Sequence, residues 1–198
     1  MTWPNLLSAL RVALIPLFII AVIHGDAGKA LLIFSLAAIT DLFDGFIARF
    51  YQQQSVLGAY LDPMADKLLL TSAYIMLAIP GLHPGLIIPV WVTVLVITRD
   101  VIIVVVALIV YLQLGISDFK PSWISKWNTA FQLIAVFLVL LSGLFPILEM
   151  TALITVFIVV ALTISSGLEY AYRFIYKAPE RAAEARARSE SASPSGQE

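Results

Sequence analysis

Residues 86–113 read LIIPVWVTVLVITRDVIIVVVALIVYLQ, and this stretch decides the fold class. Its only charged residues are Arg99 and Asp100. A helix that crosses a bilayer needs about 20 predominantly apolar residues, so the stretch is long enough to span a membrane. Turn-forming residues flank it, with Pro84-Gly85 before it and Gly115 after it. We therefore predict a transmembrane helix over residues 86–113.

Five further apolar stretches of similar length lie outside this one. They predict transmembrane helices over residues 5–24, 29–50, 60–80, 124–146 and 149–174. The whole chain of 198 residues is 61% hydrophobic and 13% charged, whereas a soluble domain carries about 25% charged residues. This composition excludes a soluble enzyme and a nucleic-acid-binding protein, and the absence of cysteine excludes a secreted disulfide scaffold. The sequence therefore predicts an all-α integral membrane protein with six transmembrane helices.

The two ends of the chain differ from its apolar middle. The first residues, with Trp3 as an anchor, predict a short interfacial N-terminal segment before the first span. The last 22 residues contain no large apolar side chain but hold eight of the 25 charged residues. We expect one six-helix membrane domain over residues 1–176 and a polar, disordered cytoplasmic tail over residues 177–198.

The distribution of basic residues predicts the orientation in the membrane. With six spans, both termini and the loops near residues 51–59 and 114–123 share one side. The basic residues on that side are Arg49, Lys120, Lys126, Arg173, Lys177, Arg181, Arg186 and Arg188, against Lys29 alone on the other. The positive-inside rule then places both termini in the cytoplasm. Because the first span begins near Met1 without an Arg- and Ser-rich presequence, we expect a bacterial cytoplasmic membrane.

Four aspartates at the end of the second span and the start of the third are the candidate chemical centre. Asp41 and Asp44 are three residues apart, and Asp62 and Asp66 are four apart, so each pair shares a helix face. Four neighbouring carboxylates need a compensating cation, and oxygen ligands with substrate phosphates suit Mg²⁺. A two-metal site for phosphoryl chemistry is the natural extension. The alternative, a cation or proton transporter, leaves the small residues around the aspartates unexplained.

Those small residues are Gly45 and Ala48, which leave room for a substrate against the second helix, and Gly58 at the start of the third. Arg49 follows them and is suited to hold a phosphate. From Asp41 to Asp66 the chain reads D-x2-D-G-x2-A-R-x8-G-x3-D-x3-D. This spacing resembles the signature of the CDP-alcohol phosphatidyltransferase family, and the resemblance extends from Pro4 to about residue 172.

The resemblance implies a six-helix membrane enzyme, usually a homodimer, that moves a phosphatidyl group from CDP-diacylglycerol to an alcohol and releases CMP. It also implies that Asp41, Asp44, Asp62 and Asp66 bind two divalent cations, Mg²⁺ or Mn²⁺. By the same resemblance Asp66 is the catalytic general base, and Gly45, Ala48 and Gly58 line the site for CDP-diacylglycerol. We expect Arg49 at this site too, because its guanidinium suits a phosphate.

The acceptor alcohol is expected to meet Lys67, Arg99, Asp100 and Lys126. Residues 120–132 read KPSWISKWNTAFQ, and together with Arg99-Asp100 they are similar to the eukaryotic-type cardiolipin synthases of this family. Phosphatidylglycerophosphate synthases more often carry Gly at the position of Ser125 and Arg-Glu at Arg99-Asp100. The resemblance thus favours phosphatidylglycerol as the acceptor, and glycerol 3-phosphate is the alternative.

Plainer interpretations of the same residues stay open. Arg99 and Asp100 can form a self-compensated pair that only fixes helix packing. Lys126 can simply extend its charged end to the membrane surface. His24 and His83 fall in the non-cytoplasmic turns, where we expect them to be solvated, and Glu169 is suited to line a cavity or an interface.

Overall fold

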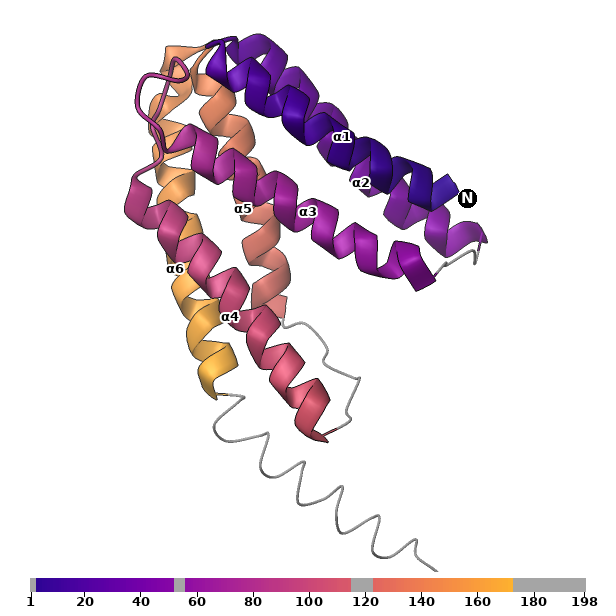
Figure 1. Cartoon of the computed structure of the whole chain (residues 1–198). Coiled ribbons are helices and arrows are strands. Elements are labelled where there is room, and N and C mark those ends of the chain that lie inside the picture. Colours follow the sequence, from indigo (N-terminus) through magenta and orange to yellow (C-terminus); the bar gives the residue numbers. More distant parts are fainter. Residues whose placement is uncertain (1–2, 52–55, 115–122, 173–198) are drawn as a thin grey trace, which may run out of the picture.

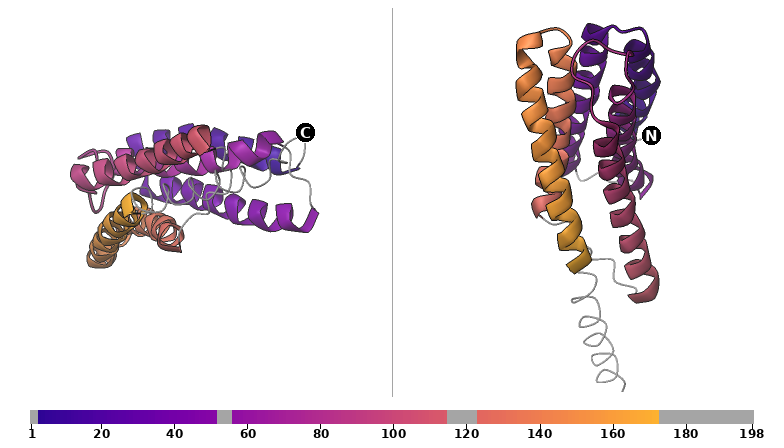
Figure 2. Two further views of the ribbon diagram at one scale, coloured as in Figure 1. Left: turned by 90° about the horizontal axis from the view of Figure 1, so that it is seen from below. Right: turned by 90° about the vertical axis from the view of Figure 1, so that its left-hand side faces the viewer.

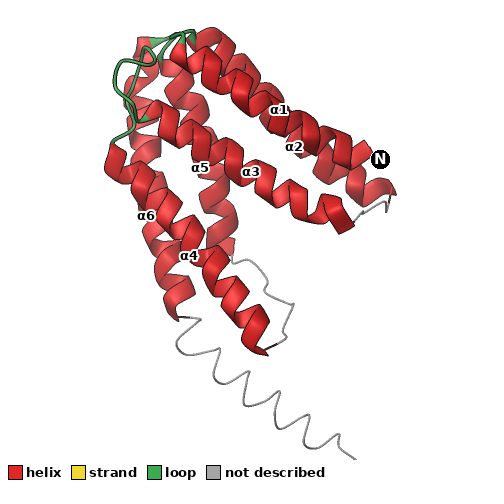
Figure 3. Cartoon of the chain, in the orientation of Figure 1, coloured by secondary structure: helices red, strands yellow, loops and turns green. Residues whose placement is uncertain are grey.

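The part of the protein that the structure describes is helical apart from its turns. The structure, a computed structural model, describes the backbone of residues 3–51, 56–114 and 123–172, and the side chains of residues 9–40, 67–105, 123–170 and 172. Across those backbone ranges no strand is present (Figure 3). The helices are α1 (Trp3–Ile23), α2 (Ala27–Tyr51), α3 (Val56–Leu77), α4 (Val90–Leu114), α5 (Trp123–Ser142) and α6 (Glu149–Tyr172), with a 3₁₀ turn η1 (Pro146–Leu148) before α6. All six predicted helices are therefore confirmed as helices.

Several helix ends differ from the prediction. Helix α3 begins at Val56 rather than at residue 60, so Gly58 lies inside it. Helix α5 ends at Ser142 rather than at residue 146, because Gly143 opens a turn that leads to Pro146. At the N-terminus, α1 is one continuous helix from Trp3 onward, so the expected interfacial segment is the first part of α1 itself.

The largest difference is the loop between α3 and α4, which turns back on the bundle. The backbone N–H of Ile88 donates to the carbonyl of Leu77 at 3.1 Å, and that of Leu86 donates to Ser142 Oγ at 3.2 Å. Because these bonds hold residues 86–89 outside any helix, α4 begins at Val90 and not at residue 86. His83 is buried in this loop, with its ring nitrogens 3.2 Å from the Leu77 carbonyl and 3.1 Å from the Pro84 carbonyl. The expectation that His83 is solvated is therefore wrong.

Two glycines let this loop approach the end of α5. Gly85 has a φ of 111°, which side-chain-bearing residues rarely adopt. A Cβ on Gly85 would lie 2.6 Å from the backbone N of Gly143, and a Cβ on Gly143 would lie 2.2 Å from the carbonyl oxygen of Pro84. The loop and the end of α5 therefore touch backbone to backbone.

The six helices converge at one end and spread at the other (Figures 1 and 2). The α1–α2, α3–α4 and α5–α6 connections gather at the converging end. The opposite end, which we call the spread end, carries the start of α1, the end of α2 and the start of α3. The aspartate-bearing segments of α2 and α3 thus lie at the spread end.

The converging end includes a capped helix start. Asp26 precedes α2 and its Oδ1 accepts the backbone N–H of Lys29 at 3.0 Å, while its Oδ2 lies 2.8 Å from Lys29 Nζ. The hydrogen bond from the Lys29 side chain, followed by that from the Lys29 backbone, lowers the pKa of Asp26 from its ordinary value. The carboxylate of Asp26 therefore supports the first turn of α2.

The outer surface is apolar along the helices. Large side chains such as Leu17, Val94, Val104 and Leu168 are more than half exposed, whereas Phe18, Phe34, Leu77 and Val136 fill the interior. Within the described residues, Trp123–Ser142 and Pro146–Tyr170 are long and apolar enough to cross a membrane, with mean hydropathies of 1.6 and 2.5. An exposed apolar surface of this extent marks contact with lipid or another protein rather than with water.

Candidate active site

The predicted metal ligands belong to two helices at the spread end. Asp41 and Asp44 lie in α2, and Asp62 and Asp66 lie in α3. Gly45, Ala48, Arg49 and Gly58, the residues predicted to line the CDP-diacylglycerol site, belong to the same two helical segments. The side chains of all eight residues lie outside the described part of the chain. Among the side chains that are described, no group of three or more His, Cys, Asp or Glu could hold a metal ion.

The best-defined polar feature next to these segments is centred on Arg99 of α4. Its side chain is only 6% exposed. One terminal nitrogen, Nη1, lies 2.7 Å from Asp100 Oδ1, and the other, Nη2, donates to Ser125 Oγ at 2.9 Å and to Ser166 Oγ. The guanidinium also lies 6.0 Å from the centre of the Tyr170 ring. A charged group this deeply buried requires such partners, so α4, α5 and α6 are joined around it.

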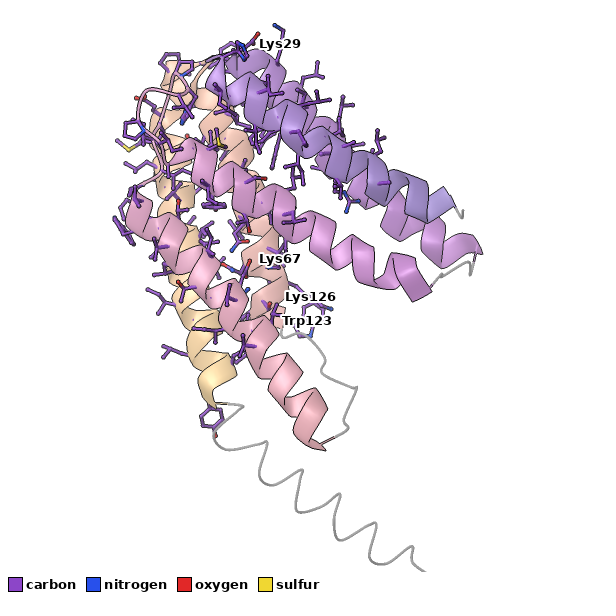
Figure 4. The ribbon with its side chains drawn as sticks, viewed as in Figure 1. Lys29, Lys67, Trp123 and Lys126 are labelled. Atoms are coloured by element: carbon purple, nitrogen blue, oxygen red, sulfur yellow. The ribbon has the colours of Figure 1, made fainter. Side chains whose placement is uncertain are left out.

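Asp100 extends this network to α3. Its second oxygen, Oδ2, accepts a hydrogen bond from Lys67 Nζ at 2.5 Å. The Asp100 side chain is 12% exposed and that of Lys67 is 39% exposed. Lys67 directly follows Asp66, and Figure 4 shows its place on α3 beside α4 and α5. Three of the four predicted acceptor residues, Lys67, Arg99 and Asp100, are therefore in contact, and we call them the acceptor cluster.

Lys126, the fourth predicted acceptor residue, makes a separate contact. Its ammonium lies 5.2 Å from the centre of the Trp123 ring, a cation–π arrangement at the start of α5 (Figure 4). Trp123 and Trp127 are 76% and 59% exposed, which suits side chains at a membrane interface. Lys126 therefore lies at the surface of the spread end.

A second layer of buried polar groups lies one helical turn further in. Thr163 of α6 donates its hydroxyl to Asn128 Oδ1 of α5 at 3.0 Å, and both residues are buried. Gln132, a further turn along α5, is fully buried, and among the described residues neither its amide oxygen nor its amide nitrogen has a hydrogen-bond partner. Polar groups thus continue from the acceptor cluster into the apolar interior.

Sequence reasoning missed the α6 members of this arrangement. Thr163, Ser166 and Tyr170 are spaced i, i+3 and i+7, so they lie on one face of α6. Ser125, Asn128 and Gln132 have the same spacing on α5. Matching polar stripes on two consecutive apolar helices are a signal that the sequence contains. It shows a shared polar face, although it does not tell which charge from another helix meets that face.

A second buried cation comes from α1. Arg11 is 0% exposed and lines a small pocket together with Ala37, Leu69 and Thr129. Ala37 precedes Asp41 by one helical turn, and Leu69 follows Asp66 by about one turn, so this pocket lies directly inside the aspartate-bearing segments. A guanidinium buried at that depth needs anionic or polar neighbours.

Comparison with known proteins supplies the family. The model of the family described as CDP-alcohol phosphatidyltransferase matches residues 1–165. A probable phosphatidylglycerophosphate synthase of Mycobacterium tuberculosis is 36% identical over 177 residues, which cover 85% of this chain and 79% of that protein. A CDP-diacylglycerol–glycerol-3-phosphate 3-phosphatidyltransferase of Haemophilus influenzae is 35% identical over 179 residues, covering 84% of this chain and 90% of that protein.

Relatives with another name match as well. The cardiolipin synthase (CMP-forming) of Rattus norvegicus is 41% identical over 151 residues, covering 68% of this chain and 48% of that protein. The corresponding human protein is 40% identical over the same length. Similarity therefore extends to proteins named for two different products.

Proposed function

Because the chain belongs to the CDP-alcohol phosphatidyltransferase family, we propose that it transfers the phosphatidyl group of CDP-diacylglycerol to phosphatidylglycerol, giving cardiolipin and CMP. Membership in the family supports phospholipid synthesis by transfer of a phosphatidyl group. Membership also favours this enzyme over the transporter considered from the aspartates alone. The acceptor and the residue roles below belong to the proposal.

The donor chemistry rests on the four aspartates. The set is made of hard carboxylate oxygens, which fits two divalent cations such as Mg²⁺ or Mn²⁺, and Asp41, Asp44, Asp62 and Asp66 would hold them. Bound there, the cations would supply charge neutralisation at the donor's pyrophosphate. Arg49, with the small residues Gly45, Ala48 and Gly58 beside it, would bind and orient the CDP portion.

Asp66 would act on the acceptor. As a general base it would take the proton of the acceptor hydroxyl. The freed oxygen would form a bond to the phosphatidyl phosphorus, and the bond from that phosphorus to the CMP phosphate oxygen would break. CMP would leave with the electron pair of the broken bond, and the phosphatidyl group would stay on the acceptor oxygen.

The charge balance around Asp100 adds support to the acceptor that the resemblance favours. Within the acceptor cluster the negative charge of Asp100 compensates the positive charge of one of the two cations. The terminal nitrogens of Arg99 are bonded to Asp100, Ser125 and Ser166. The remaining charge of about one positive unit matches a phosphodiester, which carries one negative charge. Glycerol 3-phosphate carries a phosphomonoester with about 1.5 to 2 negative charges near neutral pH and would need further cations. This balance favours phosphatidylglycerol.

Glycerol 3-phosphate is the second candidate, and a specific observation favours it. The relatives that this chain matches over most of both lengths are named for phosphatidylglycerophosphate synthesis, whereas the match to the rat cardiolipin synthase covers 48% of that protein. The product would then be phosphatidylglycerophosphate, with the same donor and the same metal site.

The membrane setting completes the proposal. Six spans with both termini and the spread end on the cytoplasmic side of a bacterial membrane would place the aspartates at the leaflet where water-soluble CMP can leave. The exposed apolar surface along the helices supports burial in lipid. A homodimer is implied by the family resemblance.

A direct assay tests the acceptor. Purified protein in lipid nanodiscs receives CDP-diacylglycerol and Mg²⁺ with either phosphatidylglycerol or glycerol 3-phosphate, and lipid products are identified by mass spectrometry. We expect cardiolipin and an equal amount of CMP with phosphatidylglycerol. Phosphatidylglycerophosphate as the only product would reject the acceptor assignment, and no CMP with either acceptor would reject the proposed function.

A further inference from the structure

We infer that Arg99 is a positioning residue, which acts through Asp100 to hold the Lys67 ammonium where the acceptor's phosphate binds. The inference rests on the proposed function and deepens it, because it separates the cation that meets the substrate from the cation that does not. Three observations support it, one for each member of the acceptor cluster.

The first observation is that both terminal nitrogens of Arg99 are bonded inside the bundle. Its side chain is 6% exposed, and its terminal nitrogens contact partners on three helices, namely Asp100, Ser125 and Ser166. To bind a substrate phosphate, Arg99 would have to give up buried hydrogen bonds to charged or polar groups. Leaving such partners unpaired in the interior is unfavourable, so the guanidinium stays within the bundle.

The second observation is that Asp100 connects two cations with separate oxygens. Oδ1 lies 2.7 Å from Arg99 Nη1, and Oδ2 lies 2.5 Å from Lys67 Nζ. A carboxylate bonded on both oxygens has one orientation, because rotation of the group would break both bonds. Arg99, fixed by the two serines, therefore fixes Asp100, and Asp100 fixes the end of Lys67.

The third observation is the exposure of Lys67. Its side chain is 39% exposed, against 12% for Asp100 and 6% for Arg99. Lys67 also follows Asp66, the proposed general base, in the same helix. Within the acceptor cluster it is the cation that a ligand can reach without displacing a buried partner. A lysine fixed in this place would set the distance between the acceptor's phosphate and the base.

The competing explanation is that Arg99 and Asp100 only hold α4, α5 and α6 together. Both explanations predict that changing Arg99 lowers stability, so stability cannot separate them. They differ in whether the effect of Arg99 on acceptor binding depends on Lys67. A double-mutant cycle measures that dependence.

The cycle uses Arg99→Lys, which keeps the charge but shortens the reach, and Lys67→Met, which keeps much of the side-chain length. Acceptor KM and kcat are measured with saturating CDP-diacylglycerol in nanodiscs. We expect Lys67→Met to raise acceptor KM about tenfold, and Arg99→Lys to raise it about fivefold in the wild-type background, consistent with the strength of charge-assisted hydrogen bonds. In the Lys67→Met background Arg99→Lys should have no further effect on KM.

A matched background distinguishes this result from a general weakening of the site. In Lys126→Met protein, Arg99→Lys should still raise acceptor KM about fivefold, because Lys126 contacts Trp123 and not the acceptor cluster. Equal effects of Arg99→Lys in the wild-type and Lys67→Met backgrounds would overturn the inference. If Arg99→Lys does not fold, Ser125→Ala takes its place, with Ser165→Ala as the control, since the Ser165 hydroxyl donates to the Ala161 carbonyl of its own helix.

A measurement without substrate separates this inference from the proposed function. The five lysines are reductively methylated with ¹³C-formaldehyde, and the Lys67 signal is assigned in the NMR spectrum by its loss in Lys67→Met. Arg99→Gln, which adds no further lysine, should shift the Lys67 signal and leave the Lys126 signal unchanged. An unchanged Lys67 signal would overturn the positioning role even in an active enzyme. A shifted signal in a protein that releases no CMP would reject the proposed function alone.

Discussion

Asp66 and Lys67 are adjacent in α3 and have opposite charges, and we propose different roles for them. Asp66 is the proposed base, whereas Lys67 is the proposed contact for the acceptor's phosphate. At the scale of residues, the two assignments are tested by different kinetic parameters. Loss of the base removes an interaction made in the transition state and lowers kcat. Loss of the lysine removes an interaction that binds the acceptor and raises its KM.

Asp66→Asn tests the base. The amide cannot take a proton from the acceptor hydroxyl, so we expect kcat to fall by about 10²- to 10⁴-fold, with the melting temperature within a few degrees of the wild type. CMP release and thermal unfolding in the same nanodisc preparation measure both quantities. Activity within tenfold of the wild type would contradict the role of Asp66 as base.

Asp26→Asn tests the cap of α2 through its pH dependence. The folded protein lowers the pKa of Asp26, so the carboxylate stabilises the fold above the pKa of the unfolded chain, about 3.9. That contribution is lost as pH falls through the folded pKa. Asn keeps the cap but not the charge, so the wild type should melt higher than Asp26→Asn at pH 7, and this difference should shrink as pH falls below about 3.9 and through the folded pKa. A difference that persists in acid would contradict this account.

At the scale of elements, the sequence predicted the six helices because long apolar runs, prolines and glycines mark them directly. It did not predict the backbone contact between the α3–α4 loop and the end of α5, since Gly85 and Gly143 are 58 positions apart in the chain. For the same reason it expected His83 in solvent. Periodicity describes one helix at a time and gives no information on what the loop beside it touches.

Gly143→Ala tests this contact. The new Cβ would lie 2.2 Å from the Pro84 carbonyl oxygen, so the loop or the end of α5 must move. Overpacking of this kind costs about 1–3 kcal/mol in the free energy of unfolding. Gly167→Ala in α6 is the control: no heavy atom of the described residues lies within 4 Å of its Cβ position, and alanine should be neutral or stabilising by up to about 1 kcal/mol there. Equal unfolding free energies for the two variants would contradict the described contact.

The sequence proposed the residues of the candidate site but did not indicate their connections. Asp41, Asp44, Asp62 and Asp66 were found from spacing alone, and their side-chain arrangement stays a prediction. Lys67, Arg99 and Asp100 were expected near the acceptor, and the structure brings them into contact. Ser166 and Tyr170 were missed, because the contacts of a polar residue in an apolar helix depend on which neighbouring helix it faces.

At the scale of the whole molecule, the account proposes six spans with the spread end in the cytoplasm. The chain contains no cysteine, so single cysteines report sidedness without background. In intact spheroplasts a membrane-impermeant maleimide should label Lys29→Cys, whose native side chain is 77% exposed at the converging end. It should label Ser191→Cys only after lysis. Labelling of Ser191→Cys in intact cells would contradict the proposed orientation.

We propose phosphatidylglycerol as the acceptor, and a competition between the two candidate acceptors decides between them. Nanodiscs with CDP-diacylglycerol, Mg²⁺ and phosphatidylglycerol are supplied with an equal amount of glycerol 3-phosphate, and both lipid products are measured over the initial phase. The ratio of products gives the ratio of kcat/KM for the two acceptors. The account predicts that cardiolipin exceeds phosphatidylglycerophosphate by at least about tenfold. An excess of phosphatidylglycerophosphate would contradict it.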